Sequence, residues 1–185
     1  ATKEDLNLIH PYDNFDVITG QGSIALEIFD IVENLDSIVV PIGGGGLISG
    51  IAIVAKHLNP RIKIFGVESN LFPSAYNNLN NTKHICSGDT IADGIAVKQP
   101  GQINIPIIEK FVDEIFLVDE ISLENAISSL FEDERIISEG AGAAGVAAIF
   151  ENKSVFKNKK VATVICGGNI DSRIFAGILN RQLSR

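Results

Sequence analysis

The segment best suited to chemistry is a run of four glycines, Gly43 to Gly46, followed by Leu47. It comes directly after a β-branched apolar run that predicts a buried strand, and directly before a predicted helix. Glycine loses more conformational freedom on folding than any other residue, so four in succession indicate that bare backbone is required. The first turn of a helix offers unpaired N–H groups and the positive end of the helix dipole. The pattern predicts a phosphate-binding loop. The structural alternative is a tight turn with crowded helix–strand packing.

Two nucleotide-binding patterns fit this loop less well. A Walker A loop requires Gly-Lys-Ser/Thr, and that triplet does not follow the glycines. A dinucleotide fingerprint requires a third glycine, but Ile48 or Ser49 occupies that position, depending on the starting glycine. Glu68 lies at the end of the next predicted strand, about where a ribose-binding acid is found. A nucleotide-binding Rossmann-like module therefore stays open as an alternative function.

A second glycine-containing segment, Cys166-Gly-Gly-Asn169, follows the last predicted strand. Ligands of open parallel sheets bind beyond the carboxyl ends of the strands, so we expect this segment and the glycine run at the same edge. Cys166 would then direct its thiol toward a bound ring, unless it is only a small buried residue that ends a strand. The histidines lack the spacing of metal ligands, and the sequence predicts no metal site from them.

Short β-branched runs alternate with segments of helical period, which predicts an α/β fold with an open, mainly parallel sheet covered by helices on both faces. The predicted strands are Ser37–Ile42, Ile62–Val67, Glu114–Val118 and Val161–Cys166. The predicted helices are Ser23–Glu33, Leu47–His57, Ile105–Phe111, Leu123–Ile137, Ala143–Phe150 and Ser172–Gln182. Ser122 is the predicted N-cap of the fourth helix. Ser69–Gly101 shows no regular pattern and is expected to be a long irregular excursion within a single domain, residues 1–185.

Composition excludes several kinds of partner. The chain has 15 basic and 23 acidic residues, a net charge of −8, with the charges scattered along the sequence. A nucleic-acid groove or an anionic membrane surface would require concentrated Lys and Arg. No apolar run approaches the ~20 residues needed to cross a bilayer. Two cysteines are too few for a secreted disulfide framework and suit a reducing cytoplasm. We therefore expect a cytoplasmic protein that binds neither nucleic acid nor membrane.

Several segments together resemble one family, the pyridoxal-phosphate enzymes of the threonine dehydratase and serine racemase group. The segments are, in order, GQGSIALEIF, VVPIGGGGLISGIA, IKIFGVE, TIADGIAV, EGAGAAGVAA and ICGGNID. The resemblance implies the type II pyridoxal-phosphate fold, with two α/β domains and the cofactor between them. It implies that the phosphate of pyridoxal 5′-phosphate is bound by Gly43, Gly44, Gly45, Gly46 and the Leu47 amide. It places Cys166 opposite the pyridine nitrogen, with Gly94 and Glu139 near the ring.

The implied reaction is elimination of water from a small amino acid, with L-threonine converted to 2-oxobutanoate and ammonia. An uncharged partner such as Cys166 does not keep the pyridine nitrogen protonated, which favours elimination over chemistry that requires a long-lived carbanion. Serine racemisation, and L-serine as the substrate, remain alternatives. We also expect a homo-oligomer that acts on a small amino-acid substrate.

This sequence departs from the family pattern in two ways. Members with a divalent-cation site use the acid that corresponds to Glu68, a carbonyl at the position of Phe72 and an acid where this chain has Ser74. The missing carboxylate weakens such a site, and no metal ligand is assigned. The family's Ser-Phe-Lys-x-Arg-Gly stretch, which contains the Schiff-base lysine, is also absent. We therefore expect a fragment that lacks the N-terminal half, is inactive alone and exposes apolar surface.

Overall fold

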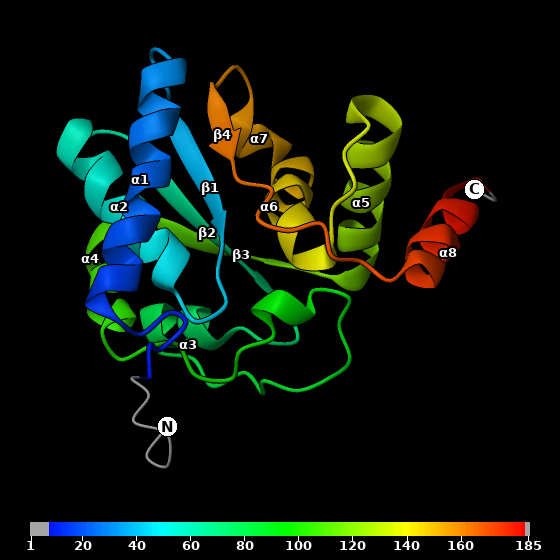
Figure 1. Ribbon diagram of the computed structural model, residues 1–185, viewed down its shortest axis with the longest axis horizontal. Coiled ribbons are helices and arrows are strands. Elements are labelled where there is room, and N and C mark those ends of the chain that lie inside the picture. The colour runs from blue at the N-terminus through cyan, green and yellow to red at the C-terminus, as the bar shows by residue number, and fades with distance from the viewer. Residues whose placement is uncertain (1–7, 184–185) are drawn as a thin grey trace.

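The fold is built on a four-stranded sheet in which every pairing is parallel. The computed structural model describes residues 8–183. The strands are β1 (Ser37–Pro41), β2 (Lys63–Ser69), β3 (Glu114–Val118) and β4 (Val161–Thr163), in the spatial order β3-β2-β1-β4. Figure 1 shows the twisted sheet between two groups of helices. The predicted fold class is confirmed.

Helices cover both faces of the sheet. The helices of one face are α1 (Phe15–Ile31), α2 (Gly46–Leu58) and α4 (Asn104–Phe111). The helices of the other face are α5 (Glu120–Glu134), α6 (Gly140–Glu151) and α8 (Ser172–Leu183), with α8 packed on α5. The short elements are α3 (Ser74–Asn80), the 3-10 turn η1 (Asp93–Ile95) and α7 (Lys153–Phe156). None of the helices between residues 8 and 183 is long and apolar enough to span a bilayer.

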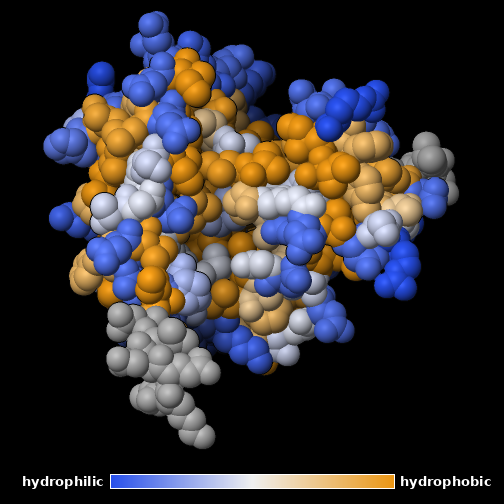
Figure 2. Space-filling view, viewed as in Figure 1, coloured by the Kyte–Doolittle hydropathy of each residue, from blue (hydrophilic) through white to orange (hydrophobic). Residues whose placement is uncertain are grey.

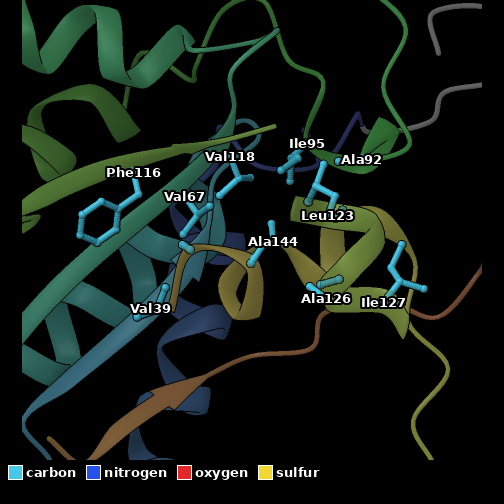
Figure 3. Packing of buried hydrophobic residues seen from close by; sticks show 14 of the residues in the cluster. Val39, Val67, Ala92, Ile95, Phe116, Val118, Leu123, Ala126, Ile127 and Ala144 are labelled. Carbon is cyan, nitrogen blue, oxygen red and sulfur yellow. The ribbon is translucent and has the colours of Figure 1, made fainter. Parts of the chain in front are cut away.

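Alternate residues of the strands face the two helical layers. In β1, Ile38 and Val40 join the cluster beneath α2, whereas Val39 joins the cluster beneath α6. Figure 3 shows the second cluster, with Val39 and Val67 of the sheet close to Ala144 of α6. All of β1 is buried, as expected for a strand that is covered on both sides. This burial explains why the strand sequences read as continuous apolar runs.

Two helix starts differ from the prediction because a nearby polar side chain supplies the cap. α1 begins at Phe15, since the side chain of Asn14 accepts hydrogen bonds from the amides of Asp16 (2.8 Å) and Val17 (3.2 Å). α5 begins at Glu120, capped by Asp119, whose carboxylate accepts from the Ser122 amide at 2.8 Å. The prediction of Ser122 as the N-cap is therefore wrong.

Other differences lie at β4, in the long excursion, at the start of α6 (Gly140 where Ala143 was predicted) and at α7, which was not predicted. β4 ends at Thr163, so Cys166 follows the strand by three residues instead of ending it. Residues 69–101 contain α3 and η1, neither of which was predicted. η1 returns to the sheet edge, where Gly94 and Ile95 lie against Gly43. The excursion therefore supplies one wall of the region beside the glycine run.

The surface around β4 is rich in apolar side chains. No strand within the described range 8–183 pairs with the outer side of β4, and residues 161–165 are only partly buried. Figure 2 shows apolar side chains gathered over the middle of this face, between α1 and α5. The sheet thus has an apolar region at this edge.

Candidate functional site

The glycine run Gly43–Gly46 connects the end of β1 to the first turn of α2. Gly45 is the N-cap of α2 and has φ 95°, in the left-handed region that side-chain-bearing residues rarely adopt. A Cβ atom at Gly45 would lie 2.9 Å from the Cβ of Asn104. Both the backbone conformation and the close approach of α4 therefore require glycine at this position.

The side chain of Tyr12 packs directly over the glycine run. A Cβ atom at Gly44 would overlap the Tyr12 ring, and one at Gly46 would lie 3.0 Å from the Tyr12 carbonyl oxygen. Close packing within the protein therefore explains part of the glycine requirement, as the structural alternative proposed. A phosphate site must rest on the unpaired amides and not on the glycines alone.

The amides at this turn are unpaired. Within the described part of the chain, no acceptor receives a hydrogen bond from the N–H groups of Gly44, Gly45, Gly46 or Leu47. The first bond of the α2 type runs from the Ser49 amide to the Gly45 carbonyl, at 3.0 Å. These N–H groups are the free donors expected at the start of a helix, next to the positive end of its dipole. The turn can therefore bind an anion.

A cavity of about 370 Å³ lies beside the glycine run. It brings together the sequence-predicted residues Gly43, Gly44, Gly45, Gly46, Leu47 and Cys166. The cavity is also lined by Tyr12, Gln21, Gly94 and Ile95. Its walls therefore come from α1, η1 and the segment after β4 as well as from the glycine run. Residues distant in sequence thus meet beyond the carboxyl ends of parallel strands, where open α/β sheets bind ligands.

Cys166 contributes an uncharged thiol to this cavity. The residue is exposed and its sulfur forms no disulfide. Partial burial of the thiol raises its pKa above the ordinary value, and the neighbouring Glu139 carboxylate raises that pKa further. Because the thiolate form is disfavoured, the side chain stays an S–H group at neutral pH. It offers a weak hydrogen-bond partner without a charge.

Gly94 lines this cavity, whereas Glu139 does not. Glu139 stands immediately before α6, and its Oε2 accepts a hydrogen bond from the Asn169 amide at 3.1 Å. The carboxylate lines a neighbouring cavity of about 430 Å³, together with Asp93 and Asn169. A ring in the first cavity would therefore meet Gly94 directly, and Glu139 lies outside the residues that line this cavity.

Glu68 is a buried acid whose oxygens already have protein donors. Its carboxylate accepts hydrogen bonds from the amides of Ala75 and Tyr76, both at 2.8 Å, and from the Ser74 hydroxyl at 3.2 Å. Burial raises its pKa to about 7. No group of three or more His, Cys, Asp or Glu side chains between residues 8 and 183 is placed to hold a metal. In this structure Glu68 supports the start of α3.

Sequence reasoning missed a set of polar contacts that we call the clasp, formed by Tyr12, Asp13 and Asn104. The Asp13 carboxylate accepts hydrogen bonds from the amides of Gln102 (3.0 Å) and Ile103 (2.9 Å). Asn104 Nδ2 donates to the carbonyl oxygens of Tyr12 (2.9 Å) and Gly44 (3.0 Å). Tyr12 and Asp13 lie at residues 10–14, in the sequence HPYDN, whereas Asn104 lies some 90 residues later, and no local pattern links the two segments.

Comparison with known proteins identifies the family to which this chain is similar. The family model for pyridoxal-phosphate dependent enzymes matches residues 1–167. The L-threonine ammonia-lyase of Thermotoga maritima is 44% identical over 177 residues, which are 95% of this chain and 44% of that protein.

Solved structures agree with this comparison. The serine racemase of Dictyostelium discoideum is 41% identical, with a TM-score of 0.83, and the match covers 92% of this chain and 56% of that one. The processed threonine deaminase isoform 2 of Solanum lycopersicum is 31% identical, with a TM-score of 0.89, over 97% of this chain and 50% of that one. The chain thus spans about half the length of the relatives that it matches. Because the family match extends over the glycine run and Cys166, the chain belongs to the pyridoxal-phosphate-dependent enzymes.

Proposed function

We propose that this chain forms the phosphate- and ring-binding part of the active site of a pyridoxal-phosphate-dependent ammonia-lyase. The substrate is a small hydroxy amino acid, L-threonine or L-serine, and L-threonine gives 2-oxobutanoate and ammonia. The observation that carries the proposal is the single cavity shared by the unpaired amides of Gly44–Leu47 and the neutral thiol of Cys166. The threonine ammonia-lyase relative, at 44% identity, supports the choice of reaction.

The residues present fit this cofactor. Four consecutive unpaired amides at the start of α2 match a phosphate group, whose charge the helix dipole stabilises. The cavity of about 370 Å³ is within the range of small-molecule sites. Pyridoxal 5′-phosphate, when bound, supplies the electron sink that makes the α-proton of an amino acid acidic.

The chain's own groups would hold and orient the cofactor. The amides of Gly44–Leu47 would fix the phosphate at the end of β1 and thereby the depth of the ring. Cys166 would face the ring nitrogen with an S–H group, and its raised pKa keeps a negative charge away from that nitrogen. A neutral partner does not hold a proton on the nitrogen as a carboxylate would, which favours rapid loss of the β-hydroxyl. The Tyr12 ring shields one side of the glycine run from water.

The lysine that carries the cofactor in this family is proposed to lie outside this chain. None of the lysines within residues 8–183 lines the cavity, and the relatives are about twice as long. We therefore propose that the 185-residue chain alone is inactive. The test is 2-oxobutanoate formation from L-threonine, measured for this chain and for a longer protein that contains it. We expect turnover by the longer protein only, and turnover by the chain alone would overturn the proposal.

Serine racemisation is the second candidate. The Dictyostelium serine racemase, at 41% identity and a TM-score of 0.83, favours it. The same longer protein, incubated with L-serine, distinguishes the two reactions. A lyase yields pyruvate and ammonia, whereas a racemase yields D-serine. Saturable binding of a nucleotide to the glycine run, detected by calorimetry, would instead support the nucleotide-binding alternative.

A further inference from the structure

We propose that Asn104 is a positioning residue that aims the Gly45 amide at the phosphate of the cofactor. The proposal rests on the proposed function, because it takes the glycine run to be the phosphate site. Asn104 does not line the cavity. It acts on the backbone of the glycine run through a buried hydrogen bond to the Gly44 carbonyl oxygen.

Two donors fix the carbonyl group of Gly44. Asn104 Nδ2 donates to this oxygen at 3.0 Å, and the Gly101 amide donates to it at 2.9 Å. Asn104 is the first residue of α4 and is completely buried, and Gly101 lies in the turn before that helix. The Gly44 carbonyl is therefore held toward α4.

The orientation of the carbonyl determines that of the next amide. The peptide bond between Gly44 and Gly45 is trans, so its N–H group points in the opposite direction to its C=O group. Gly44, Gly45 and Gly46 line the cavity, whereas no residue from 101 to 111 does, so we infer that the cavity lies on the side away from these donors. The hydrogen bonds from Gly101 and Asn104 would then turn the Gly45 N–H group toward the cavity.

The side-chain amide of Asn104 is used as a double donor. Nδ2 also donates to the Tyr12 carbonyl at 2.9 Å, and Oδ1 is buried without a partner within the described residues. Exchanging the oxygen and nitrogen would place an acceptor against two carbonyl oxygens, so this orientation is the favourable one. A buried, unpaired oxygen disfavours folding. The two hydrogen bonds from Nδ2, which hold the carbonyl groups of Gly44 and Tyr12, offset part of this cost.

The test compares the affinity of the 185-residue chain for pyridoxine 5′-phosphate and for pyridoxine, by calorimetry. Neither probe has an aldehyde, so neither reacts with lysines. The ratio of the two affinities measures the contribution of the phosphate group. Asn104→Ala removes both hydrogen bonds that Nδ2 donates and leaves the Gly101 amide in place. Asn104→Ser is a milder variant in case the first does not fold. Asn152→Ala is the matched control, because Asn152 Nδ2 donates to a single helix carbonyl, that of Ala148, at 2.9 Å.

We expect Asn104→Ala to lower the ratio by about ten- to a hundredfold, the range for misaligning a charge-assisted hydrogen bond, and Asn104→Ser to lower it less. Affinity for pyridoxine and the ratio of the Asn152→Ala control should not change. A folded Asn104 variant that keeps the wild-type ratio would overturn the positioning role. A wild-type chain without any preference for the phosphate would instead overturn the proposed phosphate site, so the two failures are distinguishable.

Discussion

Substitution of Gly44 by alanine should destabilise the fold through Tyr12. Gly44 has no positive φ, so the backbone conformation itself tolerates alanine. The added Cβ would overlap the ring of Tyr12, a residue whose backbone carbonyl accepts a hydrogen bond from Asn104. Overpacking of this kind costs about 1–3 kcal/mol. In a Tyr12→Ala background the ring is absent, and most of that cost should disappear.

The assay is a double-mutant cycle by urea unfolding, with Gly44→Ala, Tyr12→Ala and the double variant. We expect a coupling free energy of about 1–2 kcal/mol between the two positions, within the range for residues in contact. Gly20→Ala is the control, since Gly20 lies inside α1 with open space around it, and alanine should stabilise that helix by about 0.5–1 kcal/mol. Equal costs of Gly44→Ala with and without the Tyr12 ring would refute the packing argument.

Three further predictions follow from the buried acid, the site thiol and the apolar edge. Burial raises the Glu68 pKa from 4.5 to about 7, so its contribution to stability is fully present below pH 4.5 and lost as the pH rises through 7, by about 3 kcal/mol. The free energy of unfolding, measured with urea at pH 4.5 and pH 8, should show this loss in the wild type and a smaller loss in Glu68→Gln. An equal loss in the variant would contradict the role of Glu68. In a Cys86→Ala background, the alkylation of Cys166 by iodoacetamide should have a midpoint above pH 9.0, the ordinary thiol value, and a lower midpoint would exclude a neutral thiol. The apolar surface around β4 should drive self-association, which light scattering would detect, and a monodisperse monomer is the contrary result.

The sheet could be predicted from the sequence because each strand is a short apolar run followed by a helical pattern. Glu114–Val118 was predicted with its observed bounds, and the other strands within a few residues. The helix starts were less accurate. Asn14 and Asp119 each cap a helix earlier than the apolar periodicity indicates, since a cap depends on one side chain and not on a repeating pattern.

The cavity was only partly predictable. The glycine run and Cys166 both follow strands of a parallel sheet, so their meeting at one edge follows from the topology. The clasp does not, because Tyr12 and Asn104 are brought together by tertiary packing of segments that carry no shared local signal. The contacts of Glu68 were likewise not predictable from a local pattern. Its position at a strand end was evident, but its bonds to the start of α3 were not, because α3 lies in a segment without a clear helical pattern.

We propose that the unpaired amides at the start of α2 bind the phosphate of the cofactor. The most direct measurement is an amide NMR titration of the ¹⁵N-labelled chain with pyridoxine 5′-phosphate, and in parallel with pyridoxine. We expect saturable shifts of the Gly44, Gly45, Gly46 and Leu47 amides with the phosphate ester and not with the free alcohol. Shifts confined to other residues, or equal shifts with both compounds, would contradict it.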